Sequence, residues 1–303
     1  MVYMQTAGLR ACSLCWFRRI NMNYILKNEN LKVTISDAGA EILSIINEAG
    51  DEVIHQGCDV YANHCPICFP TIGIFPDGIY SYNGKDYKIK IHGFASSSVF
   101  EANQVSDTEI SFKMSSNEET LKVYPFRFDL FVNYTLKGKD LTTEYVIKNT
   151  GNDVMYYSVG SHTGYKLDKG LTGYRVKFQK PEDSLGVKLL PATYHLTAGE
   201  LIKNGVLQLD DTLFKKGCFT LTDLSSDYLI LEENNGREIA KLDFSEFKYV
   251  TFWSVPGNTY VCIEPWSCES AHYTDSNILD KQKDFTVLQA GNTKTHTHTF
   301  TIY

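Results

Sequence analysis

The chain has 303 residues and a formal net charge of −7, with 29 Lys and Arg residues against 36 Asp and Glu residues. This acidic balance, without a long run of Lys or Arg, excludes proteins that bind nucleic acid through a basic surface. No stretch approaches the roughly 20 apolar residues that cross a bilayer, so we expect no membrane insertion. Aromatic residues make up 13% of the chain, which favours β-structure over a helical bundle.

Residues 1–21 form a basic leader that differs from the rest of the chain. Its apolar piece, 11–17, is short, is interrupted by Ser13 and precedes Arg18 and Arg19, which is a poor match to a secretory signal. We expect the leader to be disordered or non-native. No linker or shift in composition divides 22–303, so we expect one domain over that range.

Eight cysteines are scattered along the chain, without the dense spacing of a small disulfide framework. This pattern predicts reduced thiols in a cytoplasmic protein. The pairs Cys12/Cys15 and Cys65/Cys68 have the spacing of a Cys₄ zinc site. The second pair is followed by a Phe-Pro dipeptide instead of the turn of a zinc knuckle, so we expect core thiols and no metal.

Short β-rich runs alternate with turn residues from Met22 onward. The runs 31–35, 41–47 and 52–55 predict an antiparallel meander. Residues 61–80 are rich in Pro and Gly, which predicts a loop or an edge segment over one mouth of the sheet. Asn83-Gly84 between the runs 80–82 and 87–91 predicts a hairpin, and places His92 at the exit of its second strand.

The clearest alternation of apolar and polar residues spans 126–136 and continues over 141–147. A third run, 154–159, follows a Gly-Asn turn and leads directly to His162. These three runs predict neighbouring central strands of a large antiparallel sheet, with His162 leaving from the edge of that sheet.

Further β-rich runs continue to the C-terminus, and helix signals are almost absent. Residues 210–216 and 275–280 have at most the signal of a single turn. A count of about twenty strands requires two packed sheets to bury both faces. The sequence therefore predicts an all-β fold, a single large antiparallel β-sandwich.

The run FWSVPGNTYVCIEPW at 252–266 predicts a hairpin that ends in a carboxylate, Glu264. Burial of that strand would raise the pKa of Glu264, as suits a general base. Pro265 lacks an N–H, so we expect regular pairing to end there, with Glu264 at a sheet margin beside Trp266. From this stretch alone, a strand cap or the partner of an arginine explains Glu264 equally well.

The histidines divide into two groups by position. His92 and His162 lie at predicted strand ends between turn residues, as Glu264 does, and are candidates for acid–base chemistry. His296 and His298 share one strand face and could bind a metal, but a solvated edge strand is favoured. We expect purely structural roles for the remaining candidates, His55, His64, His195 and His272.

Three segments together resemble one known family: His92-Gly93-Phe94-Ala95, GSHTGY at 160–165, and CIEPW at 262–266. Their order and separations are similar to those of the aldose 1-epimerase (galactose mutarotase) family, and most of all to its bacterial LacX-like branch. The resemblance covers about 22–303. It implies a galactose mutarotase-like supersandwich with a sugar cleft on one sheet face. It also implies cofactor-independent interconversion of the α and β anomers of a free aldose, by a monomer or a homodimer.

The resemblance also implies roles for individual residues. Glu264 would be the general base, His162 the general acid, and His92 a hydrogen-bonding partner of the sugar. The residue types suit this independently, because opening a hemiacetal requires one group to remove a proton while another delivers one. Phe94 and Trp266 would stack on the sugar as substrate-binding residues, with core packing as the alternative for each.

The chain also departs from the family pattern. Ile74 and Ser96 stand where family members usually carry arginines, and the substrate-binding Asp has no clear counterpart, with Asp210 and Asp211 as candidates. These departures keep an alternative open, a non-catalytic carbohydrate-binding or sensing protein on the same fold. A purely structural β-sandwich is a third reading.

Overall fold

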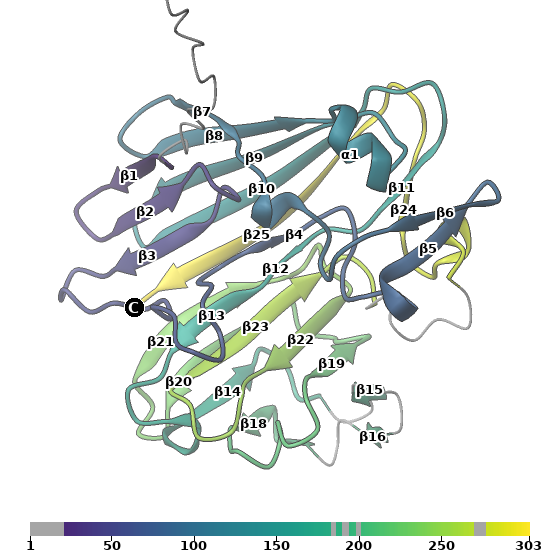
Figure 1. Ribbon diagram of the computed structural model, residues 1–303. Coiled ribbons are helices and arrows are strands. Elements are labelled where there is room, and N and C mark those ends of the chain that lie inside the picture. Colours follow the sequence, from purple (N-terminus) through teal and green to yellow (C-terminus); the bar gives the residue numbers. More distant parts are fainter. Residues whose placement is uncertain (1–20, 183–185, 190–193, 198–200, 270–276) are drawn as a thin grey trace, which may run out of the picture.

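The computed structural model describes residues 21–182, 186–189, 194–197, 201–269 and 277–303 (Figure 1). The leader, with Cys12 and Cys15, and His272 lie outside this part of the chain. The described residues form an almost entirely β structure dominated by two large antiparallel sheets. The predicted all-β class is therefore confirmed.

The larger sheet has ten strands and contains the alternating runs that the sequence indicates. Its longest ladder joins β9 and β10 over ten residues, from Lys137 opposite Asp140 to Phe128 opposite Asn149, and alternate residues of both strands are buried. Its strand order is β17 (Ile202–Lys203), β18 (Val206–Gln208), β14 (Tyr174–Phe178), β20 (Tyr228–Glu233), β21 (Glu238–Asp243), β25 (Thr293–Ile302), β10 (Asp140–Asn149), β9 (Phe128–Lys137), β8 (Glu109–Ser115) and β7 (Glu101–Gln104).

The second sheet has eight strands, and β23 is its most buried member. All seven residues of β23 are buried, so both of its faces are covered. The order is β16 (Tyr194–Thr197), β15 (Gly186–Leu189), β19 (Phe219–Thr222), β22 (Tyr249–Trp253), β23 (Tyr260–Trp266), β12 (Gly160–Ser161) and β4 (Ile67–Cys68), and β13 (Thr163–Lys166) also pairs with β23.

Three smaller sheets complete the fold. Two runs of the predicted meander form β2 (Lys32–Ser36) and β3 (Ile42–Ile46), and β1 (Asn23–Lys27) pairs with β2. The third predicted run, 52–55, makes only isolated bridges, so that strand was predicted wrongly. The predicted Asn-Gly hairpin forms β5 (Ile79–Tyr82) and β6 (Lys85–Lys88). Asn83 and Gly84 both have positive φ, as a two-residue hairpin turn of this type requires. Met155–Tyr157 (β11) pairs with Thr286–Leu288 (β24). Short 3₁₀ turns cover Pro76–Gly78, Ala95–Ser97, Leu171–Gly173 and Leu279–Lys281.

A contiguous hydrophobic cluster lies between the two large sheets. It contains Val132 of β9 and Leu242 of β21, together with Val250 of β22 and Ile263 of β23. In Figure 1, β22 and β23 lie in front of the fainter, more distant β20 and β21. Burial of both inner faces is what two packed sheets provide.

The third of the predicted central strands is not in the ten-stranded sheet, so that prediction was wrong. The second neighbour of β10 is β25, from the end of the chain, because the run after β10 leaves this sheet. That run forms β11 and then enters the eight-stranded sheet as β12 and β13. His162 therefore lies beside β23 and not at the edge of the larger sheet.

Helix α1 (Glu118–Val123) was not predicted from the sequence. Asn117 caps it by accepting hydrogen bonds from the N–H groups of Glu119 and Thr120, while the Thr120 hydroxyl accepts one from the Asn117 N–H. This is a reciprocal capping box built from Asn and Thr. No helix in the described part of the chain is long and apolar enough to cross a membrane.

The prediction that His296 and His298 lie on a solvated edge strand was also wrong. Their strand, β25, runs between β21 and β10, and both imidazoles are buried. The Nε2 atom of His296 lies 3.0 Å from the Tyr157 hydroxyl. Burial lowers the pKa of His296 to about 4 and that of His298 to about 3.

These buried histidines predict that the protein loses stability on acidification. Between about pH 6.5 and pH 4 the unfolded chain protonates both imidazoles while the folded chain does not, so stability rises with pH across this window. Each histidine contributes on the order of 1 kcal/mol per pH unit there. Thermal unfolding followed by circular dichroism from pH 5 to pH 8 measures the slope.

His298→Leu is the matched variant, because it removes one of the buried histidines that titrate in this window and keeps an apolar neighbourhood. We expect a shallower dependence of the unfolding temperature on pH below about 6.5. An identical slope in both proteins would contradict the assignment.

Candidate active site

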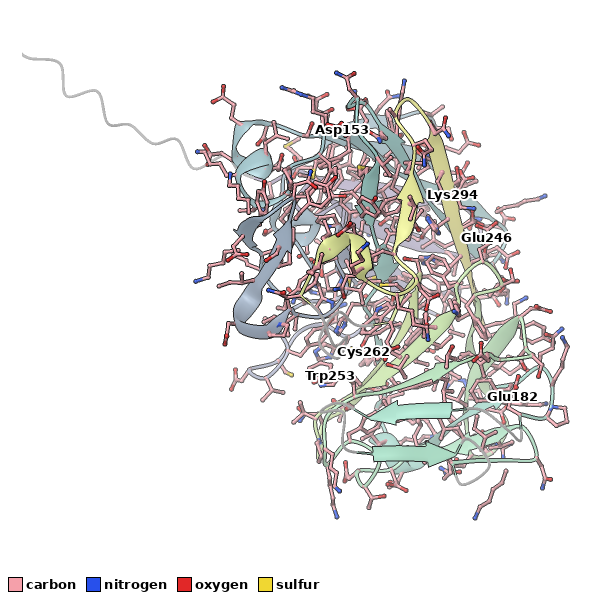
Figure 2. All side chains as sticks on the ribbon, turned by 90° about the vertical axis from the view of Figure 1, so that its right-hand side faces the viewer. Asp153, Glu182, Glu246, Trp253, Cys262 and Lys294 are labelled. Atoms are coloured by element: carbon pink, nitrogen blue, oxygen red, sulfur yellow. The ribbon has the colours of Figure 1, made fainter. Side chains whose placement is uncertain are left out.

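A cavity of about 740 Å³ opens on the eight-stranded sheet. It brings together four of the five predicted site residues, His92, His162, Glu264 and Trp266. The lining residues come from the segment 61–74, the hairpin exit, the junction of β12 and β13, the residues just before β19, and β22 and β23. They are Tyr61, Asn63, Pro66, Ile67, Cys68, Gly73, Ile74, Ile91, His92, Ser96, His162, Lys216, Gly217, Cys218, Thr251, Trp253, Glu264 and Trp266. Trp253 is opposite Cys262 in the pairing of β22 with β23, and Figure 2 labels both.

An interruption in the β-ladder places His162 against Glu264. On one side of β23, Trp266 is opposite Gly160 and Ile263 is opposite Thr163, so two residues of β23 have no ladder partner there. Pro265 is one of them, and a residue without an N–H is tolerated at such a gap. The N–H of His162 donates instead to the carbonyl of Pro66, at 3.0 Å.

Two sequence expectations about the end of β23 were therefore wrong. Pairing does not end at Pro265, because β23 continues through Trp266, which is opposite Tyr249 of β22. Glu264 is not at a sheet margin but in the interior, with β22 on one side and the interruption on the other. The N–H that Pro265 lacks therefore affects only the ladder with β12 and β13, and not the ladder with β22.

Gly160 permits the close approach of β12 to β23. A Cβ atom at this position would lie 2.5 Å from the carbonyl oxygen of Pro265 and 2.7 Å from the Trp266 ring. Both distances are far inside van der Waals contact. The glycine is thus needed for β12 to approach the end of β23 that carries Glu264.

His92 is fixed by its backbone and by one ring nitrogen. His92 adopts a positive φ of 59°, and the following Gly93 has a φ of 77°. A Cβ atom at position 93 would lie only 2.2 Å from the Phe69 carbonyl oxygen, so no side chain fits there. The Gly73 N–H donates to His92 Nδ1 at 3.2 Å. Because Nδ1 is an acceptor, the neutral ring carries its proton on Nε2 and is a donor there.

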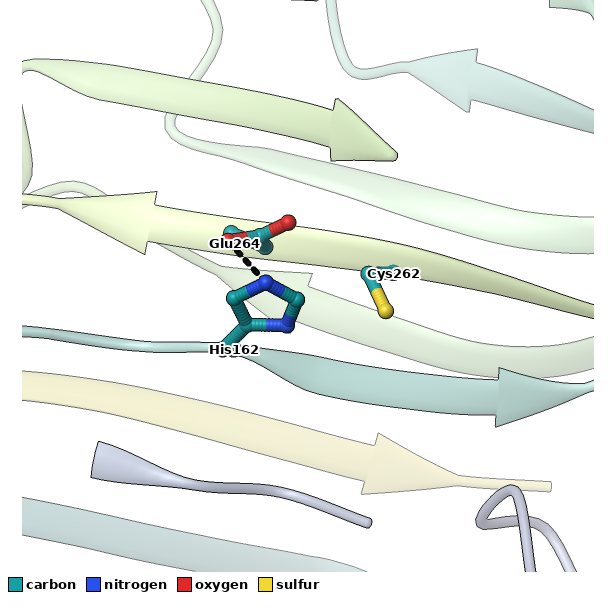
Figure 3. Close-up of side chains that lie close together, drawn as sticks. All are labelled: His162, Cys262 and Glu264. Carbon is teal, nitrogen blue, oxygen red and sulfur yellow. Dashed lines mark ion pairs between the residues drawn. The ribbon is translucent and has the colours of Figure 1, made fainter. Parts of the chain in front are cut away.

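Figure 3 shows the His162 and Glu264 side chains facing each other, with His162 Nε2 3.3 Å from Glu264 Oε2. The two side chains are only 12% and 1% exposed. Burial raises the pKa of Glu264 well above its ordinary value and lowers the pKa of His162 to about 4. Both shifts favour uncharged groups, a protonated Glu264 carboxyl beside a neutral His162 imidazole.

The pair has an unfilled hydrogen-bonding capacity. Glu264 Oε2 and Trp266 Nε1 are both buried and have no hydrogen-bond partner of acceptable geometry. The His92 ring lies 5.3 Å from the His162 ring and 5.7 Å from the Trp266 ring, centroid to centroid. Burial, with a smaller effect from His162, lowers the pKa of His92 to about 3, so it too is uncharged. A polar ligand would find donors and an acceptor within one small volume.

Tyr61 is a residue of the cavity that the sequence analysis missed. Its hydroxyl lies 3.0 Å from His162 Nδ1 and donates to the His162 carbonyl oxygen, also at 3.0 Å. It lies in the Pro- and Gly-rich run, 101 positions from His162 and outside every recognisable motif. Asn63, Lys216 and Thr251 line the cavity as well and were equally without a local signal.

Phe94 is the predicted site residue that the structure does not bring to the cavity. Its ring packs against the core, with ring centroids 6.3 Å from Phe69, 6.2 Å from Tyr124 and 6.1 Å from Phe128. Phe94 therefore packs in the core, which was the alternative to its predicted role in substrate binding. His92 and Ser96, two positions away on either side, do line the cavity.

The candidates for a substrate-binding Asp also lie elsewhere. Asp210 accepts from the Thr212 N–H within a turn, and Asp211 accepts from the Gly257 N–H. Among the described residues that line the cavity, Glu264 is the one carboxylate and Lys216 the one lysine or arginine. Ile74 and Ser96, the two positions at which the sequence was expected to depart from the resembled family, both line it.

The arrangement includes three metal-ligand types. One ligand atom each from His162, Cys262 and Glu264 lie within 4.8 Å of one another (Figure 3). Burial, followed by the nearby Glu264 carboxylate, raises the pKa of the Cys262 thiol well above its ordinary value, which opposes the thiolate that a metal requires. Cys65 and Cys68 are buried free thiols, and the Cys65 sulfur forms a hydrogen bond with the Thr163 hydroxyl.

Comparison with known proteins places this chain in a family. The aldose 1-epimerase family profile matches residues 22–301. The protein LacX (chromosomal) of Lactococcus lactis subsp. lactis is 29% identical over 297 residues, which cover 93% of this chain and 99% of LacX.

Two solved structures share the fold over most of their length. A galactose mutarotase related enzyme from Lactobacillus acidophilus has a TM-score of 0.87 and 26% identity, covering 93% of this chain and 97% of its own. A galactose mutarotase-like protein from Lactobacillus casei has a TM-score of 0.85 and 24% identity, covering 93% and 100%. The chain therefore belongs to the aldose 1-epimerase family.

Proposed function

We propose that this protein is an active aldose 1-epimerase that interconverts the α and β anomers of a free aldose. The observation that carries the proposal is the buried pair of His162 and Glu264, 3.3 Å apart at the wall of a cavity of about 740 Å³. That volume falls within the range of roughly 300 to 1,000 Å³ common for small-molecule sites. Both members of the pair exchange protons, and the wall around them is largely uncharged.

Ring opening requires two proton transfers on the sugar. Glu264, as the base, removes the proton from the hydroxyl on C1, and His162, as the acid, delivers a proton to the ring oxygen O5. The C1–O5 bond breaks and C1 becomes an aldehyde. Rotation about the C1–C2 bond presents the other face of the carbonyl, and the reversed proton transfers close the ring as the other anomer.

The His162–Glu264 pair holds one transferable proton, which is the number that these reaction steps require. A neutral His162 beside a protonated Glu264 carries the same single transferable proton as an imidazolium beside a carboxylate. In the empty site burial favours the neutral form, as the two pKa shifts indicate. Sugar hydroxyls that donate to the carboxylate would favour its charged form, and so move the proton to His162. Neither form requires a cofactor for the balance.

The surrounding residues suit an uncharged sugar. His92 offers Nε2–H as a donor to O5 or a neighbouring hydroxyl, and Trp266 offers an indole face and an unpaired N–H. Ile74 and Ser96 present no charge where the family pattern has arginines, which favours an unphosphorylated aldose. The free thiols of the described cysteines suit a reducing compartment such as the cytoplasm.

Glu264→Gln should lower kcat by about 100-fold or more, because the amide cannot accept the C1 hydroxyl proton. The measurement is anomer exchange of fresh α-glucose and α-galactose, by polarimetry or NMR, with the buffer rate subtracted. Glu232→Gln is the matched control, since Glu232 is a buried carboxylate that pairs with Arg175 and does not line the cavity.

Two outcomes would count against the proposal. A wild-type protein that leaves the buffer rate unchanged with every aldose tested, but binds sugar saturably, would support the non-catalytic sugar-binding alternative. A Glu264→Gln variant with the wild-type rate would remove Glu264 from the chemistry.

The pH dependence of kcat/KM should lack the inflection of an ordinary histidine at about pH 6.5. A second proton binds the pair only as the pH falls towards the depressed pKa of His162, about 4, so activity should persist from pH 7 to pH 5. On the alkaline side activity should fall as the raised pKa of Glu264 is passed and the pair loses its last proton. Circular dichroism at each pH corrects for the folded fraction, and a half-loss near pH 6.5 in folded protein would contradict the assignment.

A further inference from the structure

Tyr61 contacts His162 on the ring nitrogen that Glu264 does not approach. The Tyr61 hydroxyl lies 3.0 Å from His162 Nδ1, and it donates to the backbone carbonyl of the same residue at 3.0 Å. Glu264 Oε2 faces the other nitrogen, Nε2, at 3.3 Å. The two nitrogens of one imidazole thus have different partners from different parts of the chain.

The two contacts of the Tyr61 hydroxyl are hydrogen bonds at the same time only if Nδ1 carries a proton. A phenol has one proton to donate and a carbonyl oxygen can only accept, so in that arrangement the Tyr61 proton goes to the His162 carbonyl. The Tyr61 oxygen then accepts from the ring, which requires a proton on Nδ1. In the neutral imidazole this leaves the lone pair on Nε2, and in the imidazolium it leaves the second proton there.

That assignment is the one the acid–base pair needs. With the neutral proton on Nε2 instead, an N–H would face the protonated carboxyl of Glu264, and the ring would have no lone pair on the cavity side. His162 could then neither accept the proton from Glu264 nor pass it to a sugar. A proton held on Nδ1 keeps Nε2 as the titrating atom.

Tyr61 is itself held firmly enough to impose this choice. Its ring is stacked on that of Tyr260, with centroids 5.4 Å apart, and meets the Trp253 ring edge-on at 5.1 Å. Its carbonyl accepts from the N–H of Cys58 and lies 3.1 Å from His55 Nε2. Burial, with smaller effects from Cys262 and Glu264, raises the pKa of Tyr61 far above its ordinary value, so the phenol keeps its proton.

We propose that Tyr61 is a positioning residue that holds His162 in the Nδ1–H form, so that Nε2, opposite Glu264, carries the transferable proton. The inference rests on the proposed epimerase function and assigns the atom through which His162 acts. Tyr61 itself exchanges no proton with the sugar; it works through the orientation and tautomer of the imidazole.

The direct test is nitrogen NMR of the histidine rings in the ¹⁵N-labelled protein at pH 7, where His162 is uncharged. The His162 signals are assigned by their loss in His162→Gln. We expect a protonated-type shift at Nδ1 and an unprotonated-type shift at Nε2. The opposite pattern in the wild-type protein overturns the proposal without any need for a variant or for activity.

Tyr61→Phe tests the cause, because it keeps the stacked ring and removes only the hydroxyl. We expect the two His162 nitrogens to move toward averaged shifts, kcat to fall about 10- to 100-fold and KM to change less than about twofold, as for residues that orient a reacting group. Tyr260→Phe is the matched control from the same aromatic cluster, since its hydroxyl makes no hydrogen bond to His162. It should leave the tautomer and kcat unchanged.

The outcomes separate this inference from the proposed function. An unaltered His162 tautomer in Tyr61→Phe overturns the positioning role, whether or not kcat falls. An Nδ1–H tautomer that is lost in Tyr61→Phe but not in Tyr260→Phe supports it, even if the wild-type protein accelerates no anomer exchange. In that last case the epimerase proposal fails alone.

Discussion

His162 can face Glu264 because the β-ladder beside β23 is interrupted for two residues. With continuous pairing, the backbone of residues 161 and 162 would bond to β23. Instead β12 and β13 pair on either side of the gap, and the His162 N–H bonds to Pro66. Pro265 stands in the gap without leaving a donor unsatisfied, and Gly160 lets the two strands approach. The site is thus a local exception in an otherwise regular sheet, held by the strands around it.

Much of this fold follows from local sequence signals, since period-two alternation and turn residues act over a few positions. The long β9 and β10 pair and the Asn83-Gly84 hairpin are of this kind, and so is the burial of Glu264. Partners distant in sequence have no such signal. The neighbour of β10 is β25, nearly 150 residues later, and the polar face of 293–299 gives no hint that β10 and β21 enclose it.

The site residues also differ in whether a local sequence signal marks them. His92, His162 and Glu264 were recognisable because each belongs to a distinctive short segment. The role of Pro265 was not, because it depends on which of the two ladders beside β23 is interrupted. Phe94 illustrates the opposite error. It belongs to the same segment as His92, but the left-handed turn at His92 and Gly93 sends successive side chains to different sides, and Phe94 joins the core. Tyr61 could be found only from coordinates.

The energetics of the pair connect the fold to the chemistry. A buried polar atom without a partner costs about 1 to 3 kcal/mol, and Glu264 Oε2 is such an atom. A strand buried on both faces within a two-sheet core can sustain that cost, and a ligand hydroxyl would recover it. The same burial disfavours charge on Glu264 and His162, and so favours a protonated carboxyl beside a neutral imidazole. In the proposed reaction, hydrogen bonds from the sugar to the carboxylate would offset this preference and favour the proton on His162, 3.3 Å away. A fully solvated ion pair would lack this sensitivity, because water would already have satisfied both groups.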